Sequence, residues 1–105
     1  MERYVTVRRS FSAGHTEPSC GPRHHGHTYS LKATAGSKDA DALVKALDAF
    51  VGEIDQREMT EQFPAVPPTP EGLALFLLER LRLTVPSILR VRIGTGQMSW
   101  EVIDR

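Results

Sequence analysis

Three of the four histidines in this 105-residue chain lie in the stretch CGPRHHGHTY, residues 20–29, and the fourth, His15, precedes it in FSAGH. A neutral imidazole is a good ligand for Zn(II). Three protein nitrogens with a fourth position left for water or substrate are typical of catalytic zinc. The residue types therefore indicate a metal site, provided that the backbone brings the rings together. The alternative is that these are unrelated histidines of a surface loop.

The parity of the flanking segments indicates how the rings could meet. Residues two apart in a strand point to the same face, so His25 and His27 share the face of Tyr29, whereas His24 points elsewhere. His15 has the parity of the apolar residues that precede it. If the two segments pair as a hairpin, His15, His25 and His27 meet at its loop end, and we expect them to be the metal ligands.

The only cysteine, Cys20, lies in the loop that would close over these histidines. A thiol near a cation loses its proton more easily, which makes Cys20 a candidate general base or nucleophile. Two alternatives stay open, because Cys20 could be a fourth ligand that closes a structural zinc site, or an inert buried thiol. A single cysteine cannot form an internal disulfide framework, and it suits a reducing compartment.

Periodic patterns predict the elements that would position these side chains. Alternation of apolar and polar residues predicts strands over 3–11 and 27–36 and a final hairpin over 87–103. An apolar stripe with helical spacing predicts a helix over 39–56. Thr69, Pro70 and Glu71 are typical of an N-cap, a first-turn proline and a first-turn acid, and predict a second helix that ends near Leu83.

The resulting order, β-β-α-α-β-β, predicts an α+β fold in which two helices cover one face of a four-stranded antiparallel sheet. At this length we expect a single domain, residues 1–105. The chain itself supplies no cover for the other face of the sheet. Shared burial with a partner is therefore expected.

Charge and hydropathy exclude several classes of function. The chain has 13 basic and 13 acidic residues and no block of like charge, which argues against nucleic-acid and membrane binding. No run approaches the roughly 20 apolar residues that a membrane span requires. The first residues carry charges throughout and do not form the apolar segment of a signal peptide. We expect a cytoplasmic protein that acts on a small molecule.

Five motifs together resemble the 6-pyruvoyl-tetrahydropterin synthase family, including the 6-carboxytetrahydropterin synthases of deazapurine biosynthesis. They are FSAGH, a cysteine followed by HGHTY, IDQ at the end of the first helix, PTPEG at the start of the second, and SW in the last hairpin. The resemblance spans nearly the whole chain. It implies the tunnelling fold, whose subunits join their sheets into a barrel, usually as two trimers that make a hexamer with sites between subunits.

The resemblance also implies an activity, that of a zinc-dependent carbon–oxygen or carbon–carbon lyase acting on the side chain of a reduced pterin triphosphate or a related small molecule. His15, His25 and His27 would bind Zn(II), and Cys20 would remove a proton from that side chain. The metal would polarise a carbonyl or hydroxyl group and stabilise the negative charge that forms as the proton leaves.

Two positions depart from the family pattern. Asp55 is present at the end of the first helix, but Gln56 stands where a histidine is expected, and glutamine cannot exchange a proton near neutral pH. The proton relay is either lost or supplied by another residue, for which His24 is the candidate. Thr95 stands at the glutamate that anchors the amino-pyrimidine edge of the pterin, and it lacks the carboxylate that this edge requires. An altered pocket is expected.

Several assignments keep a plainer alternative. Asp55 could be a solvated carboxylate at a helix end, and Glu71, a candidate substrate contact, could be an ordinary first-turn acid. Arg90 and Arg92 are expected on a solvated strand face rather than in a phosphate clamp. The chain as a whole could be a non-catalytic or degenerate member that binds metal or a small ligand, or a zinc-stabilised interaction module.

Overall fold

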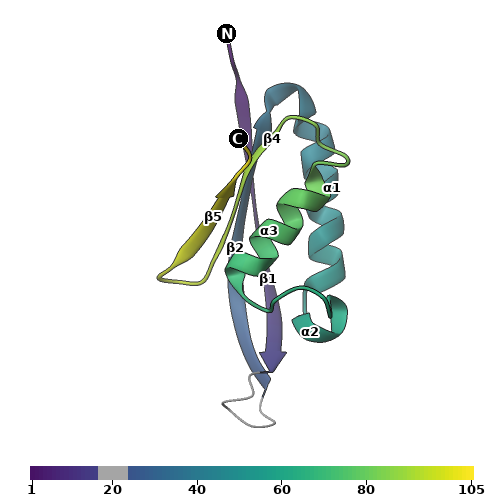
Figure 1. Ribbon diagram of the computed structural model, residues 1–105, viewed down its shortest axis with the longest axis vertical. Coiled ribbons are helices and arrows are strands. Elements are labelled where there is room, and N and C mark those ends of the chain that lie inside the picture. The colour runs from purple at the N-terminus through teal and green to yellow at the C-terminus, as the bar shows by residue number, and fades with distance from the viewer. Residues whose placement is uncertain (17–23) are drawn as a thin grey trace.

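The computed structural model describes the backbone of residues 1–16 and 24–105 and the side chains of residues 1–14 and 27–105. A sheet lies on one side of the molecule and the helices lie on the other (Figure 1). The elements follow in the order β1 (Tyr4–Thr16), β2 (His24–Gly36), η2 (Ser37–Asp39), α1 (Ala40–Ile54), β3 (Arg57–Glu58), α2 (Met59–Gln62), α3 (Pro70–Leu81), β4 (Ile88–Gly94) and β5 (Ser99–Ile103).

The sheet has five strands in the order β3-β1-β2-β4-β5, so the predicted four-stranded sheet is wrong by one edge strand. That strand, β3, runs parallel to β1, whereas the other pairs are antiparallel. The first helix ends at Ile54 rather than at residue 56, because Asp55 is extended and Gln56 has a positive φ of 65°. The chain therefore turns out of the helix at Asp55, so that the next residues can run alongside β1. The predicted α+β class and the two long helices are confirmed.

The β1–β2 hairpin is the longest pairing in the sheet. Its register runs without a shift from Tyr4 opposite Gly36 to Thr16 opposite His24. The next pairing, β2 with β4, is interrupted by an irregularity between Thr34 and Ala35. The Thr16 end of β1 and the His24 end of β2 continue past the helices (Figure 1).

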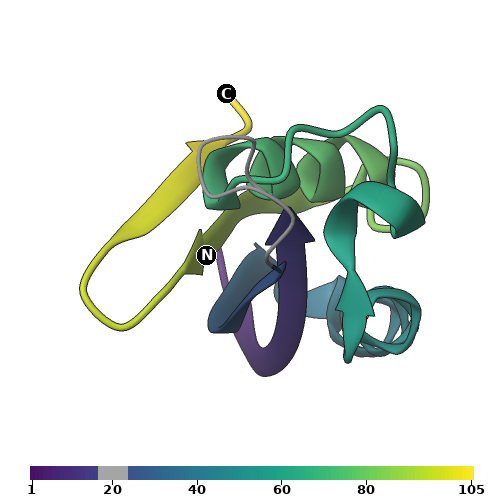
Figure 2. The ribbon, with the colours of Figure 1, turned by 90° about the horizontal axis from the view of Figure 1, so that it is seen from below.

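The two long helices cover one side of the sheet, with α1 against β1 and α3 against β4 and β5 (Figure 2). The predicted stripe of α1 is buried at Leu43, Leu47, Phe50 and Ile54. Each such side chain stabilises the fold by about 1.5–3 kcal/mol when it is fully buried. Phe11 stacks on Tyr29 with ring centroids 5.2 Å apart, which ties the hairpin into the same core.

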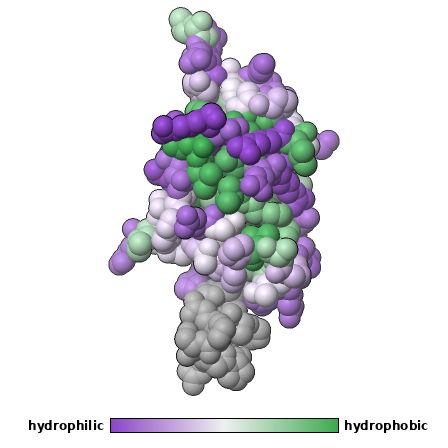
Figure 3. Space-filling model, in the orientation of Figure 1, coloured by the Kyte–Doolittle hydropathy of each residue, from purple (hydrophilic) through white to green (hydrophobic). Residues whose placement is uncertain are grey.

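Helix α3 begins as its sequence predicts. Thr69 is the N-cap, and its hydroxyl accepts a hydrogen bond of 3.0 Å from the amide of Gly72. The buried residues of α3 have the spacing of one face of a helix: Leu73, Ala74, Leu77, Leu78 and Leu81. Apolar patches still reach the surface between charged side chains in the view of Figure 3. None of the helices in the described part of the chain combines the length and the apolar character that crossing a membrane would require.

The carboxylate of Asp39 links the turn before α1 to the segment before β4 by hydrogen bonds. Both the amide and the hydroxyl of Ser87 donate to Asp39 Oδ2, at 3.1 and 2.5 Å, and the amide of Gly36 donates to the Ser87 hydroxyl at 2.9 Å. The hydrogen bond from the Ser87 side chain is the main cause that holds the pKa of Asp39 below its ordinary value; the Ser87 amide and the charge of Lys38 act in the same direction.

Because the pKa of Asp39 is lowered by folding, its contribution to stability is present at neutral pH and is lost as the pH falls through the folded-state pKa, below 3.8. We expect Asp39→Ala to lower Tm at pH 7, and the gap from the unmodified protein to shrink at pH 3. Thermal unfolding followed by circular dichroism measures both. Asp41→Ala, which removes an exposed carboxylate from the first turn of α1, is the control. A gap of equal size at the two pH values contradicts the assignment.

Candidate functional site

The loop end of the hairpin brings the histidine positions together. His15 is directly opposite His25 in the ladder, and His27 is opposite Ala13. Opposite residues share a face of the sheet, as do residues two apart. The predicted pairing is therefore confirmed for the backbone. The side chains of His15, His24 and His25 lie outside the described part of the structure, as does Cys20, so their assignment as ligands, relay and base stays a prediction.

His27 is the one histidine whose side chain the structure describes, and it lies at the edge of the aromatic core. Its ring meets Tyr29 edge-on, with centroids 5.9 Å apart. Tyr29 is only 2% exposed, whereas His27 is exposed. Along β2, the buried residues of this face thus end at Tyr29, and His27 begins the accessible part.

An open pocket of about 380 Å³ lies beside His27. Three neighbouring strands supply its lining: Ser12, Ala13 and Gly14 from β1, His27 and Thr28 from β2, and Arg57 and Glu58 from β3, with Gln56 just before β3. A small molecule in this pocket would contact imidazole, hydroxyl, amide, guanidinium and carboxylate groups. The pocket therefore offers both hydrogen-bonding and charged partners next to the predicted metal ligand.

Two hydrogen bonds to Ser12 determine where the end of α1 lies. The amide of Ser12 donates to Asp55 Oδ1 at 2.8 Å, and the amide of Gln56 donates to the carbonyl of Ser12 at 2.6 Å. The carboxylate of Asp55 is half-buried and bound to backbone, so it is more than a solvated helix-end charge. Its predicted catalytic role is untested, but its positioning role follows directly from these contacts.

Gln56 is exposed in the pocket and has a left-handed backbone conformation, with φ of 65°. That conformation costs a residue with a side chain about 1–2 kcal/mol. The cost is offset locally by the hydrogen bonds to Ser12. A strained position of this kind, over-determined by its surroundings, is often found at a ligand site.

Arg57 and Glu58 line the pocket but were not predicted from the sequence. They pair with Ala13 and Gly14 of β1, and Glu58 Oε2 also accepts a hydrogen bond of 2.8 Å from the amide of Glu61. A strand of two residues has no periodicity to detect. The sequence feature that could have identified these two residues is the pair of adjacent opposite charges immediately after the IDQ motif.

The structure does not bring Thr95 and Glu71 to this pocket. Thr95 is in the β4–β5 turn, where its amide donates to the carbonyl of Met98 at 2.9 Å. Since β4 lies on the far side of β2 from β1 and β3, three strand spacings, about 14 Å, separate the strand of Thr95 from that of Gln56. Glu71 is exposed in the first turn of α3 and does not line the pocket.

Comparison with solved structures identifies the fold as that of the 6-pyruvoyl tetrahydropterin synthases. The enzyme of this name from Caenorhabditis elegans is similar with a TM-score of 0.76 and 19% identity, over 98% of this chain and 97% of that one. An uncharacterized protein from Wolinella succinogenes gives 0.74 and 17%, over 100% and 99%. The 6-pyruvoyl tetrahydropterin synthase of Plasmodium vivax gives 0.70 and 14%, over 97% of each chain.

Comparison of the sequence, in addition to the fold, identifies the family. The model of the 6-pyruvoyl tetrahydropterin synthase family matches residues 4–104, and the chain belongs to this family. The predicted resemblance is thereby confirmed. A protein named dihydroneopterin monophosphate aldolase, from Pyrococcus furiosus, is 29% identical over 100 residues, which cover 88% of this chain and 86% of that protein.

The contacts of Asp55 lead to a test that separates positioning from catalysis. We expect Asp55→Ala to lower the free energy of unfolding by about 1–2 kcal/mol, because the Ser12 amide loses its acceptor. Asp55→Asn keeps an acceptor oxygen and should lose less than half as much. Urea denaturation measures both. The control is Asp48→Ala, a substitution on the same helix that removes an exposed ion pair with Arg9 of β1. It should lower the free energy of unfolding by less than about 1 kcal/mol.

The two Asp55 variants also test whether this residue takes part in catalysis. If Asp55 also takes part in proton transfer, Asp55→Asn will lose activity while retaining stability. Equal destabilisation by the Ala and Asn substitutions would show that the bond to Ser12 does not position the end of α1.

Proposed function

We propose that this protein is a zinc-dependent lyase that cleaves a carbon–carbon bond in the side chain of a reduced, phosphorylated pterin. The observation that supports this most is the unbroken hairpin register, which sets His15 opposite His25, with His27 next on the same face and beside an open pocket. Family membership supplies the pterin context. The similarity to a dihydroneopterin monophosphate aldolase favours cleavage of the side chain over loss of triphosphate.

The donor set fits a zinc ion. His15, His25 and His27 would hold it, because neutral imidazoles are preferred zinc ligands and three of them leave a position for substrate. When bound, the metal would act as a Lewis acid on an oxygen of the substrate side chain. His27 is exposed at the pocket, as a ligand with access to substrate has to be.

The proposed reaction is a retro-aldol cleavage, and the chain supplies proton transfer and positioning. A base removes the proton from the side-chain hydroxyl next to the bond that breaks. The carbon–carbon bond then opens, its electron pair passes into the reduced pterin ring, and a proton is returned to the carbon left on the ring. The products are a shortened pterin and a phosphorylated two-carbon aldehyde. Cys20 is the proposed base, with His24 as a relay in place of the histidine that Gln56 replaces.

Arg57 is the proposed contact for the phosphate of the substrate. It is an exposed cation in the lining of the pocket, in line with Ala13 and His27 across three strands. A guanidinium group binds phosphate through two parallel hydrogen bonds. This places the anionic end of the substrate at the β3 edge and leaves the pterin ring for the rest of the site.

We expect protein purified without chelator to carry about one zinc per chain, measured by atomic emission, and to convert dihydroneopterin monophosphate. His27→Ala should lose zinc and activity together. Cys20→Ala should keep zinc and lose turnover, because a base is removed and the ligand set is not. Loss of zinc on Cys20→Ala would support the structural-zinc alternative. A zinc-loaded protein that leaves this compound and its triphosphate unchanged would support the degenerate-member alternative.

We further propose that the complete site forms between subunits. Within one chain, Thr95 lies three strand spacings from Gln56 and does not line the pocket. The edges of the sheet, β3 and β5, have no neighbour on their outer sides within the described chain. Joining the sheets of neighbouring subunits into a barrel, as a hexamer of two trimers, would cover these edges and bring the Thr95 turn of one subunit to the pocket of another.

Mixing two inactive variants tests this arrangement. Cys20→Ala removes the proposed base, and Thr95→Trp blocks the proposed pterin end of the site. If the two residues act from different subunits, co-refolding the variants should restore part of the activity, because some sites then combine two intact halves. Each variant refolded alone is the control. Activity that stays absent in a mixed oligomer of confirmed mass, by light scattering, would place both residues in one subunit's site.

A further inference from the structure

A row of cations crosses the face of the sheet that the helices leave open. Arg8 on β1 is opposite Lys32 on β2, and Lys32 is opposite Arg92 on β4. Neighbouring strands are about 4.8 Å apart, so the backbones of these three residues span about 10 Å. Like charges directly opposite each other on a sheet destabilise the pairing. The row therefore costs the sheet some stability, and a bound anion would reduce this cost.

One acidic side chain, Glu101 on β5, compensates part of this charge. Its carboxylate lies 3.6 Å from Arg90 and 4.0 Å from Arg92. Both arginines remain close to half exposed, at 45% and 46%, so these are solvent-accessible ion pairs of small energy. Within the described residues, the side chains of Arg8 and Lys32 form no ion pair, and Glu101 pairs only with the arginines of β4.

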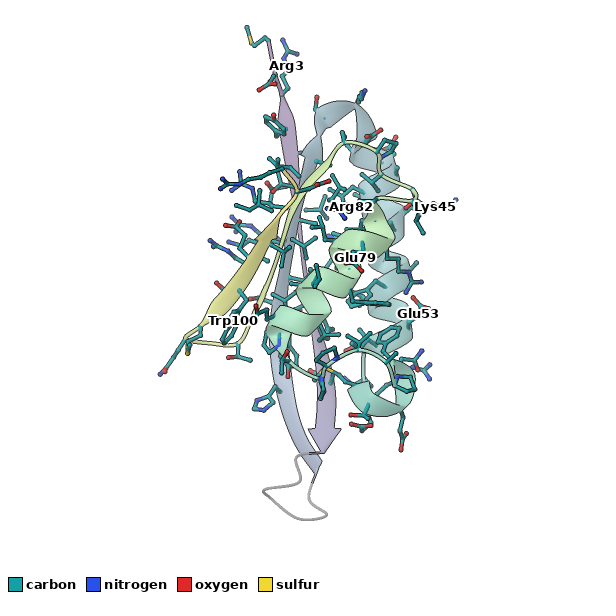
Figure 4. The ribbon with its side chains drawn as sticks, viewed as in Figure 1. Arg3, Lys45, Glu53, Glu79, Arg82 and Trp100 are labelled. Carbon is teal, nitrogen blue, oxygen red and sulfur yellow. The ribbon has the colours of Figure 1, made fainter. Side chains whose placement is uncertain are left out.

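These side chains surround a shallow hollow of about 230 Å³. Thr6 and Thr34 form part of its lining, and their hydroxyls share a hydrogen bond of 2.8 Å. The hollow thus combines four cations, one carboxylate and two hydroxyl groups. Because basic and acidic residues balance at 13 each over the whole chain, this excess of positive charge is local to the open face. Nitrogen-tipped side chains stand out from this side of the sheet, away from the helices (Figure 4).

We propose that the hollow on the open face binds a small polyphosphate anion, such as inorganic triphosphate or the phosphate chain of a nucleotide. An extended anion with several charges can lie along Arg8, Lys32 and Arg92, whereas a single phosphate reaches only part of the row. The arginines can each donate two parallel hydrogen bonds to phosphate oxygens. Because one of the two threonine hydroxyls donates to the other, the pair adds one further donor to the lining of the hollow.

A nucleic-acid strand fits the same face less well. Single-stranded nucleic acid is bound through aromatic side chains on which the bases stack, in addition to cations along the backbone. The lining of the hollow contains no aromatic residue. A short row of cations without neighbouring aromatic side chains is suited to a compact anion. This site is on the opposite side of the sheet from the helices and does not depend on the lyase activity proposed above.

The test compares Lys32→Gln with Lys45→Gln, which removes the same charge from an exposed position on α1, in the helix layer (Figure 4). Without added anion, Lys32→Gln should have a Tm equal to or above that of the unmodified protein, because repulsion within the row is relieved. With sodium triphosphate at low ionic strength, the unmodified protein and Lys45→Gln should gain thermal stability. Lys32→Gln should bind about tenfold more weakly in calorimetry, the loss of one charge-assisted contact.

Further arms of the experiment locate the anion and define what is recognised. ATP should bind with an affinity similar to that of triphosphate. The affinity for both anions should fall as NaCl screens the row of cations. The His27→Gln variant should bind triphosphate as tightly as the unmodified protein does. The proposal is overturned if the unmodified protein does not bind triphosphate, if Lys45→Gln weakens binding as much as Lys32→Gln, or if His27→Gln abolishes it. Tighter binding of a thymidine oligonucleotide than of triphosphate would also overturn it.

Discussion

The register of the β1–β2 hairpin is the constraint on which the fold and the site both depend. Side chains alternate along a strand, so a slip of one residue would move every side chain of β2 to the opposite face. The stacked pair Phe11 and Tyr29, both only 2% exposed, makes such a slip costly because it would expose aromatic surface. The same packing therefore determines the register in which position 25 is opposite position 15, and His27 is opposite Ala13.

The second requirement of the site is that the chain returns to β1 after the first helix. Phe50 and Ile54 anchor the end of α1 in the core, and Asp55 and Gln56 then bind both polar groups of the Ser12 backbone. This turns a helix end into a short parallel strand. Because the anchoring contacts are apolar and the final bonds are directional, the lining residues of β3 are positioned by packing and oriented by hydrogen bonding.

Sequence alone predicted the parts of this structure that have a period or a cap. The alternation before and after the histidines assigned the faces of β1 and β2, but not their extension to Thr16 and from His24. Thr69 with Pro70 gave the start of α3. It did not predict β3, because that strand depends on a positive φ at Gln56 and on contacts with Ser12 that are distant in the chain. Nor could parity place Thr95 relative to Gln56, since that separation depends on the order of strands in the sheet.

The two faces of the sheet contribute to stability on very different scales. Each large apolar residue buried on the helix side contributes about 1.5–3 kcal/mol, whereas each pair of opposed like charges on the open side costs only about 0.2–1 kcal/mol. The core can therefore tolerate Arg8, Lys32 and Arg92 in one row, and folding does not require that row. Arg90 and Arg92 were expected to form a solvated strand face, and they do; what parity could not show is that the register places Arg92 in line with two further cations. A bound polyphosphate, as proposed above, would offset the repulsion within this row.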